Sequence, residues 1–124
     1  MKRASPEARL HRAVAAFLSV AIKPPTMWTT IGHGGGGRVR GAQLKAMGVQ
    51  PGWPDIIVLH PNNILSCIVA GIELKAAKGA QSKSQKILAH SFNMTGANYS
   101  VCRTLEQVER ALMDCNIPLH ARTA

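Results

Sequence analysis

Apolar residues recur at helical spacing in several parts of the chain. Residues 6–20 begin after Ser5, a typical N-cap, with Pro6 at the first helical position, and their pattern predicts a helix that ends at Lys23-Pro24-Pro25. Its buried stripe consists of Leu10, Val14, Phe17, Leu18 and Ala21. The spacing also predicts helices over residues 84–94 and from Thr104 onward. Their inward positions are Ile87, Leu88 and Phe92 in the first and Leu105, Val108, Leu112 and Met113 in the second.

Short continuous apolar runs predict strands between these helices. Residues 56–59 are all Ile, Val or Leu, which is typical of a strand buried on both faces. The turn residues Pro61-Asn62-Asn63 follow, and residues 66–75 form a second run, so we expect an antiparallel hairpin. Residues 97–102 predict a third core strand, and the β-branched residues of 26–31 are compatible with another.

The order of these elements is typical of an α/β fold. A short helical patch that Gly48 would end precedes residues 50–54, which contain two prolines and a glycine and form a loop. Helices and strands thus follow one another along the chain, which predicts a small mixed sheet flanked by helices. A chain of 124 residues is too short for an α/β barrel or a two-domain enzyme, so we expect a single domain over residues 1–124.

Two features bear on where the protein resides. The apolar stretch at residues 13–22 follows basic residues and superficially resembles a secretory signal, but it is too short to span a bilayer, and basic residues and His11 are spaced along it at helical intervals. Three widely spaced cysteines, Cys67, Cys102 and Cys115, suggest neither a disulfide framework nor a zinc site. We therefore predict a soluble protein of the reducing cytoplasm, with no membrane partner.

The charge of the chain is strongly positive. It carries 15 lysines and arginines against 6 acidic residues, a net charge of +9. Such an excess on a small protein attracts polyanions, with nucleic acid as the first candidate and an anionic membrane surface as the second. The apolar content of 46% excludes a disordered basic tail. Because acidic residues are scarce, the position of each one is informative.

Two of the acids lie in apolar strands. Asp55 opens the run at residues 56–59, and Glu73 lies near the end of the next strand. Glu73 and Lys75 are two residues apart and project to the same face, and the hairpin brings Asp55 level with them. Taken singly, they have ordinary interpretations as solvent-facing strand residues or as an acid after proline in a turn. Together, two carboxylates at one sheet margin require a cation, and oxygen ligands favour Mg²⁺ or Mn²⁺ over zinc.

These residues also belong to a recognisable series. Gly52-Trp53-Pro54-Asp55, then Glu73-Leu74-Lys75, then Gln85 resemble the G-x-P-D, E-x-K and Q motifs of the VRR-NUC nucleases. That family is a branch of the PD-(D/E)xK superfamily and is similar to archaeal Holliday junction resolvases. The resemblance covers residues 48–108 and implies a restriction-endonuclease-like fold.

The resemblance implies a role for each matching position. Asp55 and Glu73 would bind the metal, with the main-chain carbonyl of Leu74 as a further ligand. Lys75 would orient the attacking water and stabilise charge that develops on the phosphate. Gln85 would place the substrate or support the site, and its alternative interpretation is a solvated polar residue at the start of a helix.

The family usually adds a glutamate from the first helix, and Glu7 is the candidate in this chain. It lies on the helix face of Leu10 and Val14, so it could point inward and act as a further metal ligand. An acid in the first turn of a helix is also explained by the helix dipole. Both interpretations of Glu7 stay open at this point.

Basic residues flank the motifs. Arg38, Arg40 and Lys45 follow the glycine run at residues 34–37, which lacks the G-K-[ST] of a phosphate-binding loop and is interpreted as a flexible loop. These three, with Lys78 and Lys83 beyond the E-x-K strand, are candidate contacts to a nucleic-acid backbone, or a solvated face. His33 and Trp53 have two interpretations each, a phosphate contact or a solvated histidine, and a substrate contact or a packing residue.

The sequence therefore predicts a Mg²⁺- or Mn²⁺-dependent DNA endonuclease that acts on branched, flapped or junction DNA. We expect a homodimer, because related resolvases act as pairs, in a bacterial or phage-infected cell. The alternatives are a non-catalytic nucleic-acid-binding module with the same fold and an RNA-binding protein without metal. Clustered acids repel phosphate, so Asp55 and Glu73 favour the nuclease over a mere binder.

Overall fold

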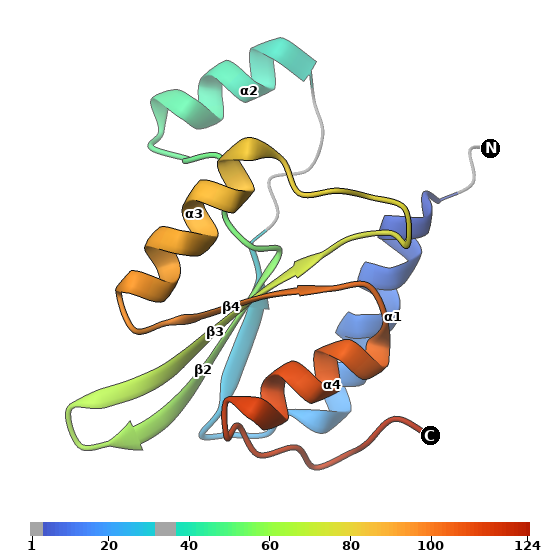
Figure 1. The fold of residues 1–124 in the computed structure, drawn as a ribbon, viewed down its shortest axis with the longest axis vertical. Helices are drawn as coiled ribbons and strands as arrows, with labels where there is room; N and C mark the ends of the chain where they lie inside the picture. The colour runs from blue at the N-terminus through green and yellow to red at the C-terminus, as the bar shows by residue number, and fades with distance from the viewer. Residues whose placement is uncertain (1–3, 32–36) are drawn as a thin grey trace.

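The computed structural model describes residues 4–31 and 37–124, in which four strands form one mixed sheet (Figure 1). The strands are β1 (Met27–Thr30), β2 (Ile56–Asn63), β3 (Ser66–Leu74) and β4 (Asn98–Cys102). The helices are α1 (Pro6–Ala21), α2 (Gly37–Ala46), α3 (Lys83–Met94) and α4 (Leu105–Asp114). The strand order is β1-β2-β3-β4, with β3 and β4 parallel and the other pairs antiparallel. The predicted small mixed sheet with flanking helices is confirmed.

One face of the sheet packs against α1 and α4 and forms the hydrophobic core. The buried residues of α1 are Val14, Phe17, Leu18 and Ala21, as the helical stripe predicted. The buried residues of α4 are Val108 and Leu112. Between them lie the alternate strand residues Ile56, Val58, Ala70, Ile72 and Leu74. Because side chains alternate along a strand, the residues between these positions face the other side of the sheet.

The second face of β3 packs against α3 and carries the functional groups. Gly71 lies there, and a Cβ atom on it would be 2.8 Å from Pro54 Cγ and 3.1 Å from a ring carbon of Phe92. Phe92 of α3 is buried, and Pro54 is fully buried. The missing side chain at Gly71 thus lets the segment before β2 and the helix α3 close over this face, two residues from Glu73 on the same side.

The hairpin between β2 and β3 turns later than predicted. Pro61 and Asn63 belong to β2, whose register shifts between them, and the turn consists of Ile64 and Leu65. The expected turn at Pro61-Asn62-Asn63 is therefore wrong, because an irregular register at the end of a strand accommodates a proline. Asn63 still provides the turn chemistry, since its side-chain oxygen accepts hydrogen bonds from the Leu65 amide and the Ser66 hydroxyl.

The ends of the last helices agree with the sequence, but two inward positions do not. Ser82 and Gln85 form a capping box at the start of α3, and the Thr104 hydroxyl accepts from the Gln107 amide at the start of α4. Ile87 was predicted to face inward and is 59% exposed, because α3 reaches the sheet through Phe92 and only partly through Leu88. Met113 was also predicted to face inward and is exposed, because α4 reaches the core through Val108 and Leu112. None of the helices in residues 4–31 and 37–124 is long and apolar enough to cross a membrane.

Candidate metal centre

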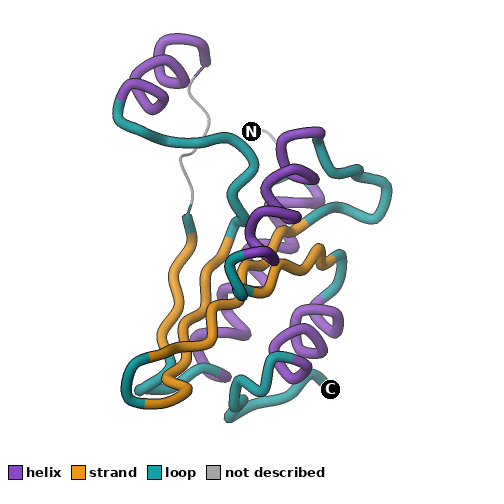
Figure 2. The backbone as a smooth tube through the Cα atoms, turned by 60° about the vertical axis from the view of Figure 1, so that its left-hand side comes forward, coloured by secondary structure: helices purple, strands orange, loops and turns teal. Residues whose placement is uncertain are grey.

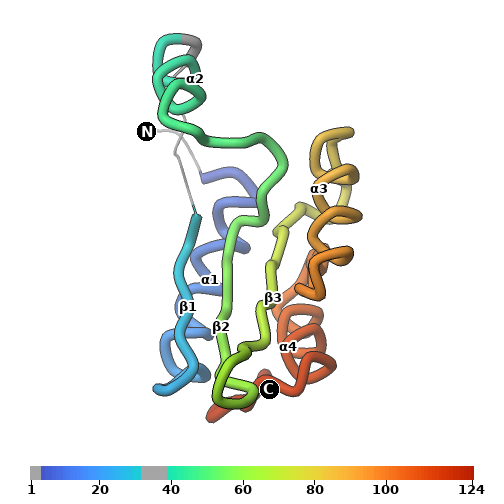
Figure 3. Tube along the Cα trace, turned by 90° about the vertical axis from the view of Figure 1, so that its left-hand side faces the viewer, coloured from blue at the N-terminus to red at the C-terminus, as the bar shows by residue number. Residues whose placement is uncertain are grey.

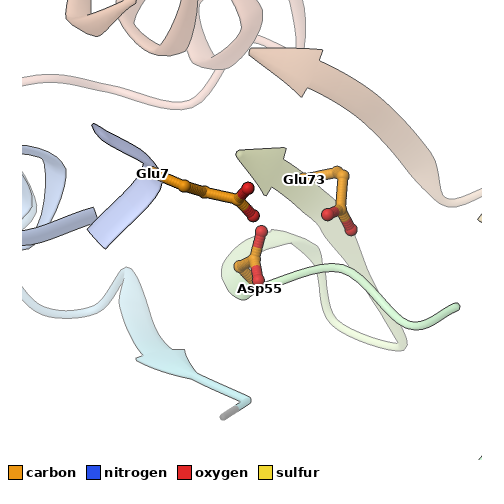
Figure 4. Close-up of side chains that lie close together, drawn as sticks. All are labelled: Glu7, Asp55 and Glu73. Atoms are coloured by element: carbon orange, nitrogen blue, oxygen red, sulfur yellow. The ribbon is translucent and has the colours of Figure 1, made fainter. Parts of the chain in front are cut away.

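Three carboxylates that are far apart in the sequence meet at one end of the sheet (Figure 4). Glu7 comes from the first turn of α1, Asp55 directly precedes β2, and Glu73 lies near the end of β3. One carboxylate oxygen from each lies within 4.8 Å of the others. The predicted hairpin brings Asp55 and Glu73 together, and the start of α1 adds Glu7 to this pair.

Asp55 is held by the main chains of two strands. Its carbonyl accepts a hydrogen bond from the Ile31 amide at 2.7 Å, just after β1. Its carboxylate Oδ2 accepts a hydrogen bond from the Leu74 amide at 2.7 Å, at the end of β3. The first bond fixes the main chain of Asp55, and the second orients its carboxylate.

Glu73 is buried with a full set of donors around it. It is 2% exposed, its Oε1 accepts from the side-chain nitrogen of Gln85 at 2.8 Å, and its Oε2 accepts from the Tyr99 hydroxyl at 3.2 Å. The Lys75 ammonium lies 3.9 Å from Oε1, so the acid and the lysine share one side of the strand end as predicted. Burying a carboxylate is costly without such partners.

Burial and, after it, the negative charge of Asp55 together raise the pKa of Glu73 to about 7, although Lys75 and Tyr99 act in the opposite direction. Without a cation, this carboxyl group is therefore close to half protonated at neutral pH. A divalent cation at the cluster would favour its ionised form.

The donor set fits a hard divalent cation. Glu7, Asp55 and Glu73 offer carboxylate oxygens, which Mg²⁺ and Mn²⁺ prefer, and no cysteine or histidine belongs to this group among the described residues. Lys75 brings one positive charge to the three acids, so added cationic charge would offset the remaining repulsion. The Leu74 amide donates to the Asp55 carboxylate, so the main chain of Leu74 lies next to the acidic cluster. The Leu74 carbonyl therefore stays a proposed additional ligand.

Gln85 combines the two interpretations that its position left open. Its side-chain oxygen accepts from the Ser82 amide at 2.9 Å and completes the cap of α3. Its side-chain nitrogen donates to Glu73, as described above. One residue thus ties the start of α3 to a carboxylate of the candidate site.

Tyr99 was not predicted as part of the site. Its hydroxyl lies 3.2 Å from Glu73 Oε2 and 3.3 Å from the carbonyl of Gly52, and burial together with the charge of Glu73 raises its pKa. The parallel register places Tyr99 beside Gly71 and so on the face of Glu73. The only signal in the sequence is that a tyrosine in a core strand needs a partner for its hydroxyl group.

The structure explains why a glycine, Gly52, stands two residues before Pro54. Gly52 has a φ of +88°, and a Cβ atom on it would lie 2.5 Å from the carbonyl oxygen of Ser84. The loop therefore touches the backbone of the first turn of α3 at a point where no side chain fits. This contact sets the distance between the Asp55 segment and the helix that carries Gln85.

We expect Gly52→Ala to destabilise the protein by more than the positive φ alone requires, by about 2 kcal/mol or more in total. Gly48→Ala is the matched control, because Gly48 has a φ of +93° but open space around its Cβ position. Urea unfolding of both variants measures the difference. Equal losses of unfolding free energy would show that the contact with Ser84 has no energetic weight.

The predicted nucleic-acid contacts lie on elements at the same end of the sheet. Arg40 and Lys45 are exposed on α2, which lies beyond the end of the sheet where β2 begins (Figures 2 and 3). Lys78 is exposed in the segment after β3, and Lys83 is exposed at the first position of α3. The side chain of Arg38, and His33 with residues 34–36 of the glycine run, fall outside the described part of the chain.

A further residue holds the segment that follows Lys75. The Arg103 guanidinium donates hydrogen bonds to the carbonyls of Ala76 and Gly79, at 2.7 and 2.5 Å. The Lys75 amide donates to the Cys102 carbonyl at 3.0 Å. The main chain on both sides of Lys75 is thus fastened to the end of β4, which the sequence did not indicate.

The architecture resembles solved structures of VRR_NUC domains. A structure described as a VRR_NUC domain aligns with a TM-score of 0.57 at 18% identity, over 90% of this chain and 97% of that chain. A second, described as a VRR_NUC domain protein, aligns with a TM-score of 0.60 at 16% identity, over 91% and 89%. No protein-family model and no curated protein sequence matches the chain. The protein therefore has the fold of a VRR_NUC domain, as its motifs predicted.

Proposed function

We propose that the protein is a metal-dependent nuclease that hydrolyses phosphodiester bonds in DNA, with branched, flapped or junction DNA as its substrate. The observation that carries this proposal is the convergence of Glu7, Asp55 and Glu73, with oxygens within 4.8 Å of one another, beside Lys75. The likeness to VRR_NUC domain structures supports a nuclease-type fold, and the site supports the chemistry.

Asp55, Glu73, Glu7 and the Leu74 carbonyl are the proposed ligands of a Mg²⁺ or Mn²⁺ ion. A divalent cation in such a site lowers the pKa of a bound water and neutralises charge on a phosphate oxygen. The protein's own contribution is to fix the ligands in advance. Asp55 is held by the Leu74 amide, and Glu73 by Gln85 and Tyr99, so neither carboxylate has to be ordered when the substrate arrives.

Lys75 is the proposed catalytic cation of the protein. Its side chain is 13% exposed and its ammonium lies 3.9 Å from Glu73 Oε1, so it is confined to the margin of the acidic cluster. A fixed positive charge at this place stabilises negative charge that develops on the phosphate and orients the attacking water. Gln85 and Tyr99 are positioning residues in this scheme, because both donate to Glu73.

The excess of basic residues supports DNA as the polyanion. Arg40, Lys45, Lys78 and Lys83, with Arg38, are the proposed contacts to the phosphate backbone on either side of the acidic cluster. A module that only binds nucleic acid would not benefit from Glu7 and its two neighbouring acids, which repel phosphate. The cluster therefore favours cleavage over binding alone.

A homodimer and a cytoplasmic setting complete the proposal. The tip of the β2-β3 hairpin exposes Ile64 and Leu65 at 98% and 93%, and Met27 on β1 is 62% exposed, so apolar surface is available for a second copy. Sedimentation at working concentration measures this, and a monomeric mass would contradict the dimer. The free thiols Cys67, Cys102 and Cys115 fit a reducing cytoplasm, for which a bacterial or phage-infected cell is proposed.

The nuclease proposal is tested by incubating branched, flapped and linear DNA with the protein in Mg²⁺ or Mn²⁺. Wild type is compared with Asp55→Ala and Lys75→Ala. We expect cleavage by wild type only, with DNA binding retained in the variants. Equal activity in all three proteins would overturn the assignment of the site. In a parallel reaction with RNA, cleavage of RNA but not of DNA would overturn DNA as the substrate.

A further inference from the structure

A cavity lies beside the candidate metal centre and is not used by the proposed chemistry. It has a volume of about 520 Å³ and lies between α2 and the segment that leads to Asp55. Its lining includes Gly41, Leu44 and Lys45 of α2, and Gln50 and Trp53 of the segment. The volume is typical of sites that hold a small organic group.

Two residues that line the cavity, Gly52 and Trp53, also lie next to the candidate metal centre. Trp53 lies two residues before Asp55, and Gly52, also part of the lining, has its carbonyl 3.3 Å from the Tyr99 hydroxyl that contacts Glu73. A group bound in the cavity would therefore lie close to a phosphate at the metal centre.

Trp53 is held on one side and accessible on the other. Its ring packs edge-to-face against Phe92 with a centroid separation of 5.7 Å, yet the residue is 42% exposed. A smaller cavity of about 220 Å³, lined by Ile31, Gly48, Val49 and Gln50, reaches the same tryptophan. A fixed and accessible indole provides a surface on which a planar group can stack.

The charge around the cavity favours an anionic occupant. Between Glu7 and Asp55 the sequence contains no acidic residue, and Lys45 lines the cavity while Arg40 is exposed on the same helix. A nucleotide combines a planar base, whose faces stack on aromatic rings, with a negative phosphate, and so matches the indole of Trp53 and the charge of Lys45 together.

We propose that this cavity receives an unpaired nucleobase of the DNA strand whose phosphate lies at the metal centre, with Trp53 as its stacking partner. This inference rests on the proposed nuclease function and names its substrate class: DNA with an unpaired nucleotide next to the cleaved bond. Gln50 and Lys45 offer polar groups for the edge of the base.

The test measures binding without divalent cations, so that cleavage plays no part. A labelled hairpin duplex carries a single-stranded extension of thymidines, or the same extension with abasic nucleotides. Wild type is expected to bind the base-bearing extension about tenfold more tightly than the abasic one. Trp53→Ala should bring this ratio close to one.

Gly41→Leu provides a second variant that keeps Trp53. A Cβ atom at Gly41 meets nothing within 4 Å, so a larger side chain fits there, and because Gly41 lines the cavity we expect it to occupy part of that space. This variant should also lose the preference for bases, whereas Gly41→Ala should keep most of it. In Trp28→Phe, Trp53 is the remaining tryptophan, and its emission should be quenched by the base-bearing extension alone.

A wild-type protein that binds both extensions equally would overturn the base-binding inference and leave the nuclease proposal standing. A preference that Gly41→Leu and Trp53→Ala both retain would overturn it as well. If the preference is present but the DNA is not cleaved in Mg²⁺ or Mn²⁺, the cavity assignment holds and the nuclease proposal fails.

Discussion

Replacing Lys75 with methionine is expected to lower the rate of DNA cleavage by about 10²–10³-fold, because it removes a fixed positive charge from the place where phosphate charge develops. The side chain is 13% exposed and close to Glu73, so other lysines of the surface cannot take its position. The rate is measured in a single turnover at saturating Mg²⁺, since losing Lys75 also makes Glu73 harder to ionise.

Lys23→Met is the matched control for this experiment. Lys23 is exposed two residues after α1, at the end of that helix opposite to Glu7, and its replacement removes the same charge. It should change the rate by less than about twofold. A Lys75→Met protein that cleaves as fast as the control would exclude the proposed catalytic role of Lys75.

Glu73→Gln is expected to stabilise the protein without metal above pH 7, by up to about 3 kcal/mol. The pKa of Glu73 is about 7 in the folded protein against 4.5 for the ordinary group, so the folded state binds more protons between these values. The stability of wild type therefore falls as the pH rises from about 4.5 to 7. The glutamine variant lacks this fall, because it has no proton to lose at this position.

Chemical denaturation at several pH values in EDTA measures this difference. Glu106→Gln on the exposed side of α4 is the control, because it removes the same charge from an exposed position. Added Mg²⁺ should then stabilise wild type but not Glu73→Gln, since a ligand stabilises only the state that binds it. If the unfolding free energies of wild type and Glu73→Gln change with pH in the same way, burial and the charge of Asp55 do not raise the pKa of Glu73.

Local sequence patterns were sufficient to predict the helices and strands and to place Glu73 and Lys75 on one side of a strand. The stripe of α1 and the strand after Pro54 were evident from spacing and apolar runs, and strand alternation placed Glu73 and Lys75 together. The turn of the hairpin was placed too early, because a proline and two asparagines are typical turn residues. The irregular register that keeps them in β2 depends on the pairing with β3 and has no local signal.

The remaining parts of the site depend on contacts between distant segments. Tyr99 reaches Glu73 only because β4 is parallel to β3 in one register, and a strand pairing of this kind cannot be read from either strand alone. Arg103 holds the segment after Lys75 by hydrogen bonds to main-chain carbonyls. Every residue has such a carbonyl, so the sequence does not indicate which ones are bound. The position of Glu7 beside the other two acids depends on where α1 packs, and this placement could not be inferred from the sequence of the helix alone.

The most direct test of the candidate metal centre is a calorimetric titration of the folded protein with Mn²⁺. The cluster of Glu7, Asp55 and Glu73 predicts saturable binding by wild type. Asp55→Asn should weaken it by about tenfold or more, and Glu7→Gln by a measurable factor. If Mn²⁺ binds wild type and Asp55→Asn with equal affinity, or does not bind wild type, the three carboxylates are not a cation site.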